Sequence, residues 1–342
     1  MKKKPRVAVF FGGTDANRDL SYSTGLWLAN SMPRETYDVT PVHVTNKGNW
    51  QVPLGALPRQ GDVTQVVGKL FEAVPARSPA KAIERLFARD IDALWSVVRG
   101  RGGDDGAMAQ FGETLKIPVI SSPAETCVLT GNKQACAGAI RNIALGPITA
   151  TVGQNEEAAE VGESLRNQMA APLFVKPVNA EGSAGVYRVE VFGELEGAIR
   201  GAQRHGDVLI QEVRAGTEVS VSVYEDAGGI HALPPTAIVP TRAAFFDSLA
   251  KRRAGRVEMK TLDSLESRLA QEVQAVAREI FEALNCRGIV TIDMVVRDDG
   301  IEVLEVNTVP TMNAHSPLYH QLRSSGVYPA RFVDSIVRRA MS

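Results

Sequence analysis

Hydrophobic positions in the first third of the chain alternate between short strand-like runs and longer helical segments. The strand-like runs are Val7–Phe11, Val39–Val44 and Ala93–Val98, and glycine or polar residues follow each of them. Between them, apolar residues recur at helical spacing, as over 63–74. Repetition of strand, loop and helix predicts a parallel sheet whose ligands bind at the carboxyl ends of its strands.

Local signals indicate where two of these helices begin. An amphipathic helix is expected from about Ser21, after the first glycine turn. Ser78 and Pro79 suit the N-cap and the first helical position, so a helix should open there. Its inward positions would be Ile83, Leu86 and Phe87.

A second unit begins near Ser122 and contains two strands joined by a glycine-rich loop. The first strand, Phe174–Val178, carries Lys176, and the loop 179–186 leads into a return strand over Tyr187–Val191. Backbone amides of such a loop can approach phosphates closely, and a lysine adds a positive charge. The pattern indicates a phosphate-binding flap, with an ordinary turn as the alternative. Further strands are expected over Val208–Val213 and Glu218–Tyr224.

The hydrophobic pattern weakens between about Ala237 and Leu262. This stretch is basic over 251–256 and has little periodicity, which is typical of a mobile lid or of disorder. A long helix is expected over Leu265–Leu284, and a closing helix over about 328–340. The inward positions of the long helix would be Leu269, Val273, Val276, Ile280 and Leu284.

Strands near the C-terminus carry carboxylates inside apolar runs. They are Ile292–Val296 and Val303–Thr308, joined by Arg297-Asp298-Asp299-Gly300. An Asp-Gly turn between apolar strands predicts a β-hairpin. Alternation places Glu305 and Asn307 on one face, and Asp293 lies on the facing strand. Such oxygen ligands suit Mg²⁺, because burying charge in apolar strands is costly without a cation. The alternative is a polar outer face on an ordinary hairpin.

Composition narrows the class of protein. At 342 residues the chain is long enough for two or three domains, and its net charge of −1 argues against a strong basic or acidic field. We therefore expect neither nucleic acid nor membrane as a partner. The apolar run Val7–Phe11 is too short for a signal sequence or a membrane span. Three cysteines without a CxxC pair favour free thiols in a reducing cytoplasm.

Taken in order, the motifs of the chain resemble the ATP-grasp superfamily, and most closely the D-alanine–D-alanine ligase family. The resemblance spans essentially the whole chain. The motifs of the first half are Phe11-Gly12-Gly13-Thr14, Gly100-Arg101-Gly102-Gly103-Asp104-Asp105-Gly106, Gly131-Asn132-Lys133, Lys176-Pro177 and Glu181-Gly182-Ser183. Those of the second half are Gly216-Thr217-Glu218, Ala250-Lys251, Asp293, Glu305, Asn307-Thr308 and Met312.

This resemblance implies an α/β protein with the ATP-grasp fold in three domains. The expected bounds are 1–122 for an N-terminal pre-ATP-grasp domain, 123–212 for a central subdomain with the phosphate loop, and 213–342 for a C-terminal subdomain with the lid and the metal site. The implied activity is that of an ADP-forming carboxylate–amine ligase, in which an amine attacks an acyl phosphate. The implied cofactors are ATP and two Mg²⁺ ions, which Mn²⁺ could replace. A cytoplasmic homodimer acting on small molecules is expected.

The same resemblance implies roles for individual residues. The nucleotide would be bound by Lys133, Lys176, Glu181, Gly182, Ser183, Gln211, Glu212, Val213, Glu218, Lys251 and Leu304. The metal ligands would be Asp293, Glu305 and Asn307. The catalytic positions would be Ser183, Lys251, Arg252 and Thr311, with Lys251 on a lid that keeps water off the acyl phosphate. The substrates would contact Asn17, Arg18, Arg99, Thr291, His315 and Ser316.

Departures from the family pattern gather at the substrate end. Where the family has a Glu-His pair, this chain has Asn17 and Arg18. Arg99 replaces a histidine of the family, and Arg252 replaces a tyrosine. Thr291 replaces an arginine, and Thr311 replaces a glycine. Because arginine binds carboxylates bidentately, the gained arginines suggest an extra anionic group on the substrate; the alternative is that they face solvent. We therefore expect small amino-acid-like substrates other than D-alanine plus D-alanine. The alternatives are an authentic D-alanine–D-alanine ligase of cell-wall synthesis, a cyclising ligase, and a non-catalytic ATP-binding relative.

Overall fold

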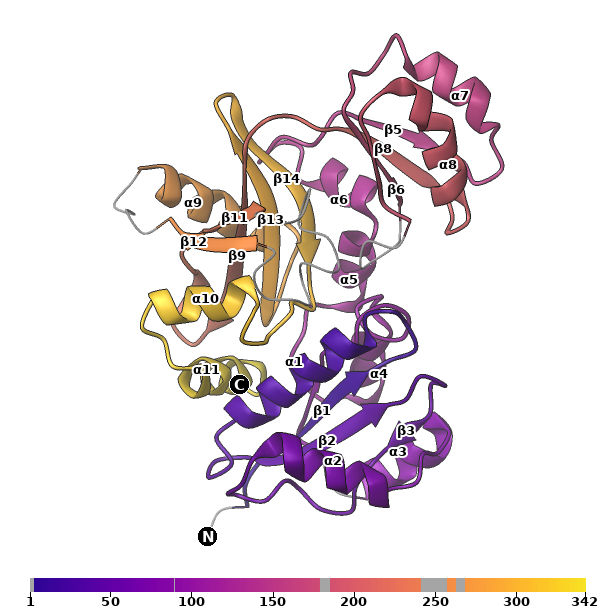
Figure 1. Ribbon diagram of the computed structural model, residues 1–342. Helices are drawn as coiled ribbons and strands as arrows, with labels where there is room; N and C mark the ends of the chain where they lie inside the picture. Colours follow the sequence, from indigo (N-terminus) through magenta and orange to yellow (C-terminus); the bar gives the residue numbers. More distant parts are fainter. Residues whose placement is uncertain (1–2, 89, 179–184, 241–256, 263–267) are drawn as a thin grey trace.

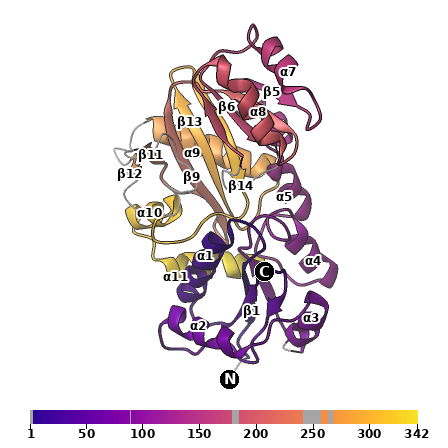
Figure 2. The same cartoon turned by 45° about the vertical axis from the view of Figure 1, so that its right-hand side comes forward.

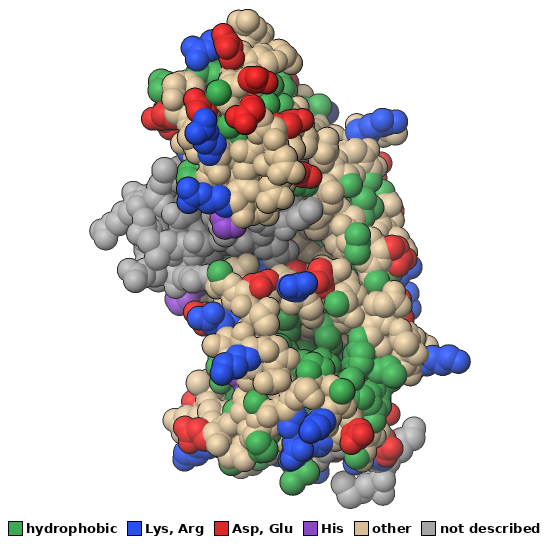
Figure 3. Space-filling model, turned by 90° about the vertical axis from the view of Figure 1, so that its right-hand side faces the viewer, with side chains coloured by type: hydrophobic (Ala, Val, Ile, Leu, Met, Phe, Trp, Pro, Cys, Tyr) green, Lys and Arg blue, Asp and Glu red, His purple; other side chains and the backbone are tan. Residues whose placement is uncertain are grey.

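The computed structural model describes residues 3–88, 90–178, 185–240, 257–262 and 268–342. Within these residues, three β-sheets are covered by helices and arranged one above another (Figure 1). Acidic and basic side chains are interspersed over the face in Figure 3, in keeping with the net charge of −1. No described helix has both the length and the apolar character needed to cross a membrane.

The first sheet has the predicted parallel arrangement around a central strand. Its order is β3-β2-β1-β4, and β1 is parallel to both β2 and β4. The strands are β1 (Arg6–Gly12), β2 (Asp38–Val44), β3 (Trp50–Gln51) and β4 (Ala93–Ser96). The helices are α1 (Arg18–Ser31), α2 (Val63–Ala73), α3 (Pro79–Phe87) and α4 (Ala107–Leu115).

The predicted helix starts in this unit are correct to within a few residues. The first helix begins at Arg18 rather than near Ser21. Pro79 takes the first position of α3 as predicted, and Ser78 stands at the N-cap. The Ser78 side chain makes no capping hydrogen bond, however, whereas the fixed φ angle of proline favours this helix start.

The second sheet is small and antiparallel, with the order β5-β8-β6-β7. As predicted, β6 and β7 are antiparallel neighbours on either side of the glycine-rich loop. Residues 179–184 of that loop lie outside the described residues. The strands are β5 (Thr149–Val152), β6 (Leu173–Pro177), β7 (Tyr187–Val189) and β8 (Val208–Glu212). The helices that cover this sheet are α7 (Ala158–Leu165), η1 (Phe192–Glu194) and α8 (Leu195–Gln203), whereas α5 (Ala124–Gly131) and α6 (Lys133–Ala139) pack against the third sheet.

The third sheet carries the predicted hairpin at its edge. Its order is β12-β11-β9-β13-β14, with β10 also paired to β9. The strands are β9 (Thr217–Asp226), β10 (Gly229–Ala232), β11 (Thr236–Pro240), β12 (Val257–Thr261), β13 (Ile289–Arg297) and β14 (Gly300–Asn307). Antiparallel β11 and β12 occupy the two ends of the weakly patterned segment, while 241–256 lies outside the described residues.

The long helix α9 (Arg268–Ala283) packs on this sheet. One predicted inward position is wrong, because Leu269 is 44% exposed. The buried positions are Ala270, Val273, Ala277, Ile280 and Phe281. The spacing of these residues defines the buried face of the helix. Leu269 is rotated about 100° around the helix axis from Ala270, and it therefore lies outside this face.

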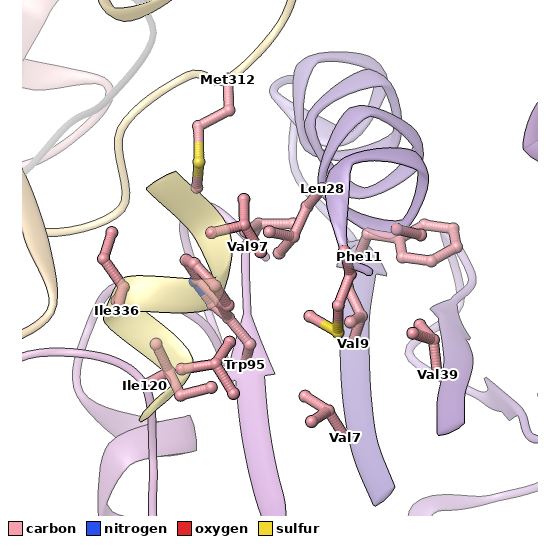
Figure 4. Close-up of a cluster of buried hydrophobic side chains, with 14 of the residues drawn as sticks. Val7, Val9, Phe11, Leu28, Val39, Trp95, Val97, Ile120, Met312 and Ile336 are labelled. Carbon is pink, nitrogen blue, oxygen red and sulfur yellow. The ribbon is translucent and has the colours of Figure 1, made fainter. Parts of the chain in front are cut away.

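The C-terminal helices return to the N-terminal sheet. They are α10 (Pro317–Ser324) and α11 (Pro329–Ala340), the latter being the predicted closing helix. In Figure 4, Ile336 of α11 lies beside Trp95 and Ile120, with Met312 above them, and all four belong to one buried cluster. Helix α11 also packs beside α1 (Figures 1 and 2). The two ends of the chain therefore share a core, while the three domain bounds stay a prediction.

Candidate active site

Rows of polar side chains cross three neighbouring strands of the third sheet. The first row is Ser220, Asp293 and Glu305, and the second row is Ser222, Thr291 and Asn307. Paired residues of adjacent strands share a face, and side chains two positions apart do so as well. All six side chains therefore lie on one side of β9, β13 and β14.

A β-bulge at Leu304 brings the two carboxylates of the first row together. Pairing is regular from the turn as far as Met294 with Val303, and it then shifts so that Asp293 pairs with Glu305. Without the shift, Asp293 would pair with Leu304, and its side chain would lie on the face opposite Glu305. We predicted the shared face from the hairpin, but not the bulge that produces it.

Hydrogen bonds orient the side chains of both rows. Ser220, which is fully buried, donates to Asp293 Oδ1 at 2.7 Å. The hydroxyls of Ser222 and Thr291 are 3.2 Å apart, and Asn307 Nδ2 donates to Asp293 Oδ2 at 3.4 Å. We did not predict the two serines. Valine and serine alternate over 219–223, which is the signal that marks their common face.

Lys133 approaches this face from the first turn of α6. Its Nζ lies 3.6 Å from Glu305 Oε1, and its side chain is 9% exposed. Asn132 caps the helix by accepting the Ala135 amide at 3.0 Å, which fixes the backbone at Lys133. A small polar pocket lies beside the pair. Its lining is Asp104, Thr130, Gly131, Lys133, Glu305, Val306, Asn307, Thr308 and Val309.

Arg99 reaches the same face from the loop between β4 and α4. It donates from Nη1 to Thr311 Oγ1 at 3.0 Å and from Nη2 to Asn307 Oδ1 at 3.1 Å. Its Nε lies 3.8 Å from Asp104 Oδ2, and the two side chains are 11% and 7% exposed. Asp104 also accepts the Gly100 amide at 2.6 Å, so it holds both the loop and the arginine.

Another pocket opens beside the Arg99 guanidinium. Its lining is Arg99, Ser220, Thr291, Asp293, Asn307, Pro310, Thr311, His315, Ser316, Pro317 and Leu318. The pocket brings together several predicted residues: the substrate positions Arg99, Thr291, His315 and Ser316, the catalytic position Thr311, and the metal ligands Asp293 and Asn307. Asn307 lines both this pocket and the one beside Lys133, so the two pockets meet at this residue.

The loop before α10 forms one wall of the Arg99 pocket. Ser316 caps α10, since its hydroxyl accepts the Tyr319 amide at 3.2 Å and donates to Asn313 O at 2.9 Å. The Met312 amide donates to Thr24 Oγ1 at 3.2 Å, which ties the loop to α1. The Ser316 hydroxyl is thus engaged in holding the loop, whereas His315 is exposed.

Asn17 and Arg18, at the start of α1, lie outside the linings of these pockets. Asn17 is 2% exposed, and its Oδ1 has no hydrogen-bond partner among the described residues. Arg18 is half exposed and lies 3.8 Å from Asp19. Asp15, two residues before Asn17, accepts the Arg101 amide at 2.7 Å, so the loop before α1 contacts the loop that carries Arg101. The substrate roles of Asn17 and Arg18 stay predictions.

The other predicted nucleotide residues are distributed over the second and third sheets. Lys176 is on β6, while Gln211 and Glu212 end β8. The Glu212 carboxylate accepts the Ala170 amide at 2.7 Å, and the Val213 amide donates to Pro172 O at 2.9 Å. Glu218 lies near the start of β9, and Leu304 is the bulge residue. Glu181, Gly182, Ser183, Lys251 and Arg252 lie outside the described residues.

The donor set on β13 and β14 fits a magnesium ion. Asp293 and Glu305 supply carboxylates, and Asn307 supplies an amide oxygen on the same face. Mg²⁺ is commonly held by one or two carboxylates, with substrate phosphates and water completing its coordination. Among the described residues, no three His, Cys, Asp or Glu side chains form a metal-binding cluster. An ion here would therefore take further oxygens from phosphate and water.

The cysteines are free, as predicted, and all three are buried. Burial raises the pKa of Cys127 and of Cys136 to about 11, and that of Cys286 to about 12. A nucleophilic cysteine needs a thiolate near neutral pH. These thiols stay protonated there and act as core side chains.

Family models match most of the chain. The model described as D-ala D-ala ligase N-terminus matches residues 6–122, and the one described as D-ala D-ala ligase C-terminus matches residues 144–338. The chain belongs to the D-alanine–D-alanine ligase family. It is therefore an ATP-dependent, ADP-forming carbon–nitrogen ligase of this type, as the sequence motifs implied.

Curated relatives align with this family member over nearly its full length. The D-alanine–D-alanine ligase of Mycobacterium sp. (strain KMS) is 30% identical, over 98% of this chain and 97% of its own length. That of Streptomyces griseus subsp. griseus is 27% identical, over 100% of this chain and 94% of its own length.

Solved structures confirm the ATP-grasp fold of this ligase. The VanG D-Ala:D-Ser ligase from Enterococcus faecalis superimposes with a TM-score of 0.79 at 20% identity, covering 99% of this chain and 100% of the other. The D-alanine–D-alanine ligase of Bacillus anthracis, in complex with ATP, gives a TM-score of 0.73 at 22% identity, covering 98% and 97%. The predicted α/β fold class is correct.

Proposed function

We propose that this ligase joins two small amino acids, with D-alanine as the leading candidate for both. The carboxylate of the first would take the γ-phosphoryl group of ATP and release ADP. The amine of the second would then attack the acyl phosphate, form the amide bond and release phosphate. The names of the curated relatives support D-alanine, and they favour the alternative of an authentic D-alanine–D-alanine ligase over our expectation of other substrates.

The observation that carries this proposal is the position of Asn307 between two different pockets. One pocket has Lys133 and Glu305 in its lining, groups that suit phosphates and their cation. The other has Arg99 and His315, groups that suit a carboxylate. Phosphoryl transfer depends mainly on positioning the reactants and neutralising their charge. Phosphates in one pocket and a carboxylate in the other would be held next to each other at Asn307, which meets the first requirement.

Each group of residues has a distinct task in this scheme. Asp293, Glu305 and Asn307 would hold Mg²⁺, which neutralises the charge on the phosphates when bound. Lys133 and Lys176 would bind phosphate oxygens, and Arg99 would bind a substrate carboxylate. We further propose that Ser183, Lys251 and Arg252 complete the site as predicted. A cytoplasmic homodimer belongs to the same proposal, and light scattering of the purified protein tests the dimer.

A substrate with an additional acidic group is the second candidate. It is favoured by the bond between Arg99 and Thr311, because two departures from the family pattern meet in one contact. The pair places a buried guanidinium, a good partner for a carboxylate, at the position where the family pattern has a histidine. In this case the reaction is the same, and only the amino-acid pocket differs.

Phosphate release in the presence of Mg²⁺ and ATP tests the proposal and separates these candidates. The assay compares D-alanine alone, D-alanine with an acidic D-amino acid, and no amino acid. Release with D-alanine alone, together with the dipeptide by mass spectrometry, supports the first candidate. Release only with an acidic partner supports the second. ATP binding with no release under any condition, and with no product, supports a non-catalytic relative and contradicts the proposal.

A further inference from the structure

The hydrogen-bond network fixes the orientation of the Asn307 side-chain amide. Arg99 has only donors, and an ionised Asp293 has only acceptors. The Asn307 oxygen must therefore face Arg99, at 3.1 Å from Nη2, and the nitrogen must face Asp293 Oδ2, at 3.4 Å. The opposite orientation would set donor against donor and acceptor against acceptor.

The oxygen that faces Arg99 is also the atom through which Asn307 would bind a cation. A cation held by this oxygen would lie close to the Nη2 donor, because both would contact the same atom. Arg99 is largely buried, so solvent screens this repulsion less than it would at the surface. A guanidinium and a divalent ion are therefore poor simultaneous partners of this one oxygen.

We propose that Arg99 and the active-site cation are alternative partners of Asn307 Oδ1, and that Arg99 turns from Asn307 toward the amino-acid pocket when the cation site fills. The inference rests on the proposed function in taking Asn307 as a metal ligand and the Arg99 pocket as the amino-acid site. Arg99 is thus a positioning residue for the metal site in one state and a carboxylate anchor in the other.

Two other contacts of Arg99 suit such an exchange. Nη1 donates to Thr311, and the Asp104 carboxylate lies 3.8 Å from Nε, so both can keep the side chain in place when Nη2 leaves Asn307. Because Arg99 lines the amino-acid pocket, a substrate carboxylate there can take over the released donor. Coupling between sites is reciprocal, so cation binding should strengthen carboxylate binding and the reverse.

Titration of the full-length protein with Mn²⁺, followed by the electron paramagnetic resonance signal of the free ion, tests the exchange without relying on activity. Arg99→Gln removes the competing donor and its charge. Arg99→Lys keeps the charge, but its single ammonium cannot span Thr311 and Asn307 as the fork does. Arg101→Gln is the matched control, because Arg101 is an exposed arginine of the same loop.

Arg99→Gln should bind Mn²⁺ about tenfold more tightly than the wild type, the size expected for losing one charge-assisted competitor. Arg99→Lys should also bind Mn²⁺ more tightly than the wild type, by a smaller factor, because its charge stays nearby. Arg101→Gln should stay within about twofold, since an exposed charge is screened. Tightening in Arg99→Gln alone would mean simple charge repulsion and would overturn the exchange, as would equal affinity in every variant. If neither the wild type nor any variant binds Mn²⁺, the assignment of the metal site is wrong. The exchange and this part of the proposed function are then both contradicted.

Discussion

Arg99 and Thr311 are 212 residues apart in the sequence, yet the arginine donates a hydrogen bond of 3.0 Å to the threonine hydroxyl. Both residues depart from the pattern of the D-alanine–D-alanine ligase family. The threonine hydroxyl accepts from a guanidinium N–H of Arg99, whose side chain is largely buried, so a polar group of each residue is satisfied by the other. The two departures therefore form one contact at the wall of the amino-acid pocket.

A double-mutant cycle should detect this contact as an energetic coupling. Removing either partner leaves the other partly unsatisfied, so Arg99→Met, Thr311→Val and the double variant should be non-additive by about 1–2 kcal/mol in the free energy of unfolding. Urea denaturation of the four proteins measures it. Strictly additive effects would mean that the hydrogen bond contributes nothing to stability.

Arg99 should matter for the amino acid and not for the nucleotide. Arg99→Ala removes a guanidinium from the pocket lining, and we expect the KM for the amino acid to rise at least about tenfold, the cost of a lost charged hydrogen bond. The KM for ATP should stay within about twofold.

Arg101→Ala is the matched control for this experiment. Arg101 is an exposed arginine of the same loop and lies outside the pocket lining, so its loss should leave both KM values nearly unchanged. An equal rise in the KM for the amino acid in both variants would point to a general charge effect. A rise for Arg101→Ala alone would contradict the placement of the substrate beside Arg99.

Ser220 should act on the metal site through Asp293. Its hydroxyl donates to Asp293 Oδ1 at 2.7 Å, and groups that orient a metal ligand are typically worth about 10- to 100-fold in metal affinity. Ser220→Ala should therefore weaken Mn²⁺ binding by about tenfold or more. Ser222 lies on the same strand and face but contacts Thr291 instead of Asp293, so Ser222→Ala should have little effect on Mn²⁺ affinity. Comparable affinities for the two variants would argue against Asp293 as a ligand.

Alkaline pH should destabilise the fold through its buried thiols. Burial raises the pKa of Cys286 from 9.0 to about 12, so between these values the unfolded chain loses a proton that the folded protein keeps. The folded state then binds more protons, and stability falls as pH rises, by up to about 1.4 kcal/mol per pH unit. Cys286→Ala should show a shallower decline in urea denaturation between about pH 9 and about pH 10.5. An unchanged slope would mean that this thiol does not set the alkaline limit.

The hairpin illustrates both what the sequence predicts and where prediction stops. Apolar strands around an Asp-Gly turn were enough to place Asp293 and Glu305 on facing strands. Their common face depends on the bulge at Leu304, and an extra residue leaves no signature in simple alternation. Ser220 and Ser222 were visible as alternation, but their partners Asp293 and Thr291 lie on a strand more than 60 residues away.

Contacts between distant segments were the least predictable part of the site. Motif order was sufficient to infer the fold, whereas the metal ligands stay a prediction. Nothing in the sequence indicated that Arg99 bonds Thr311 and Asn307, because that contact exists only once the first and third sheets are packed together. For the same reason, Arg18 and Arg99 looked equivalent in the sequence, although only Arg99 lines the pocket.

The most direct test of the central claim is phosphate release from the purified protein with Mg²⁺ and ATP, with D-alanine as the sole amino acid. A ligase that joins two small amino acids across the Asn307 site should release phosphate only when D-alanine is present, in a one-to-one ratio with the dipeptide. Phosphate release that is independent of any amino acid, or ATP binding without release or product across the panel, would contradict the account.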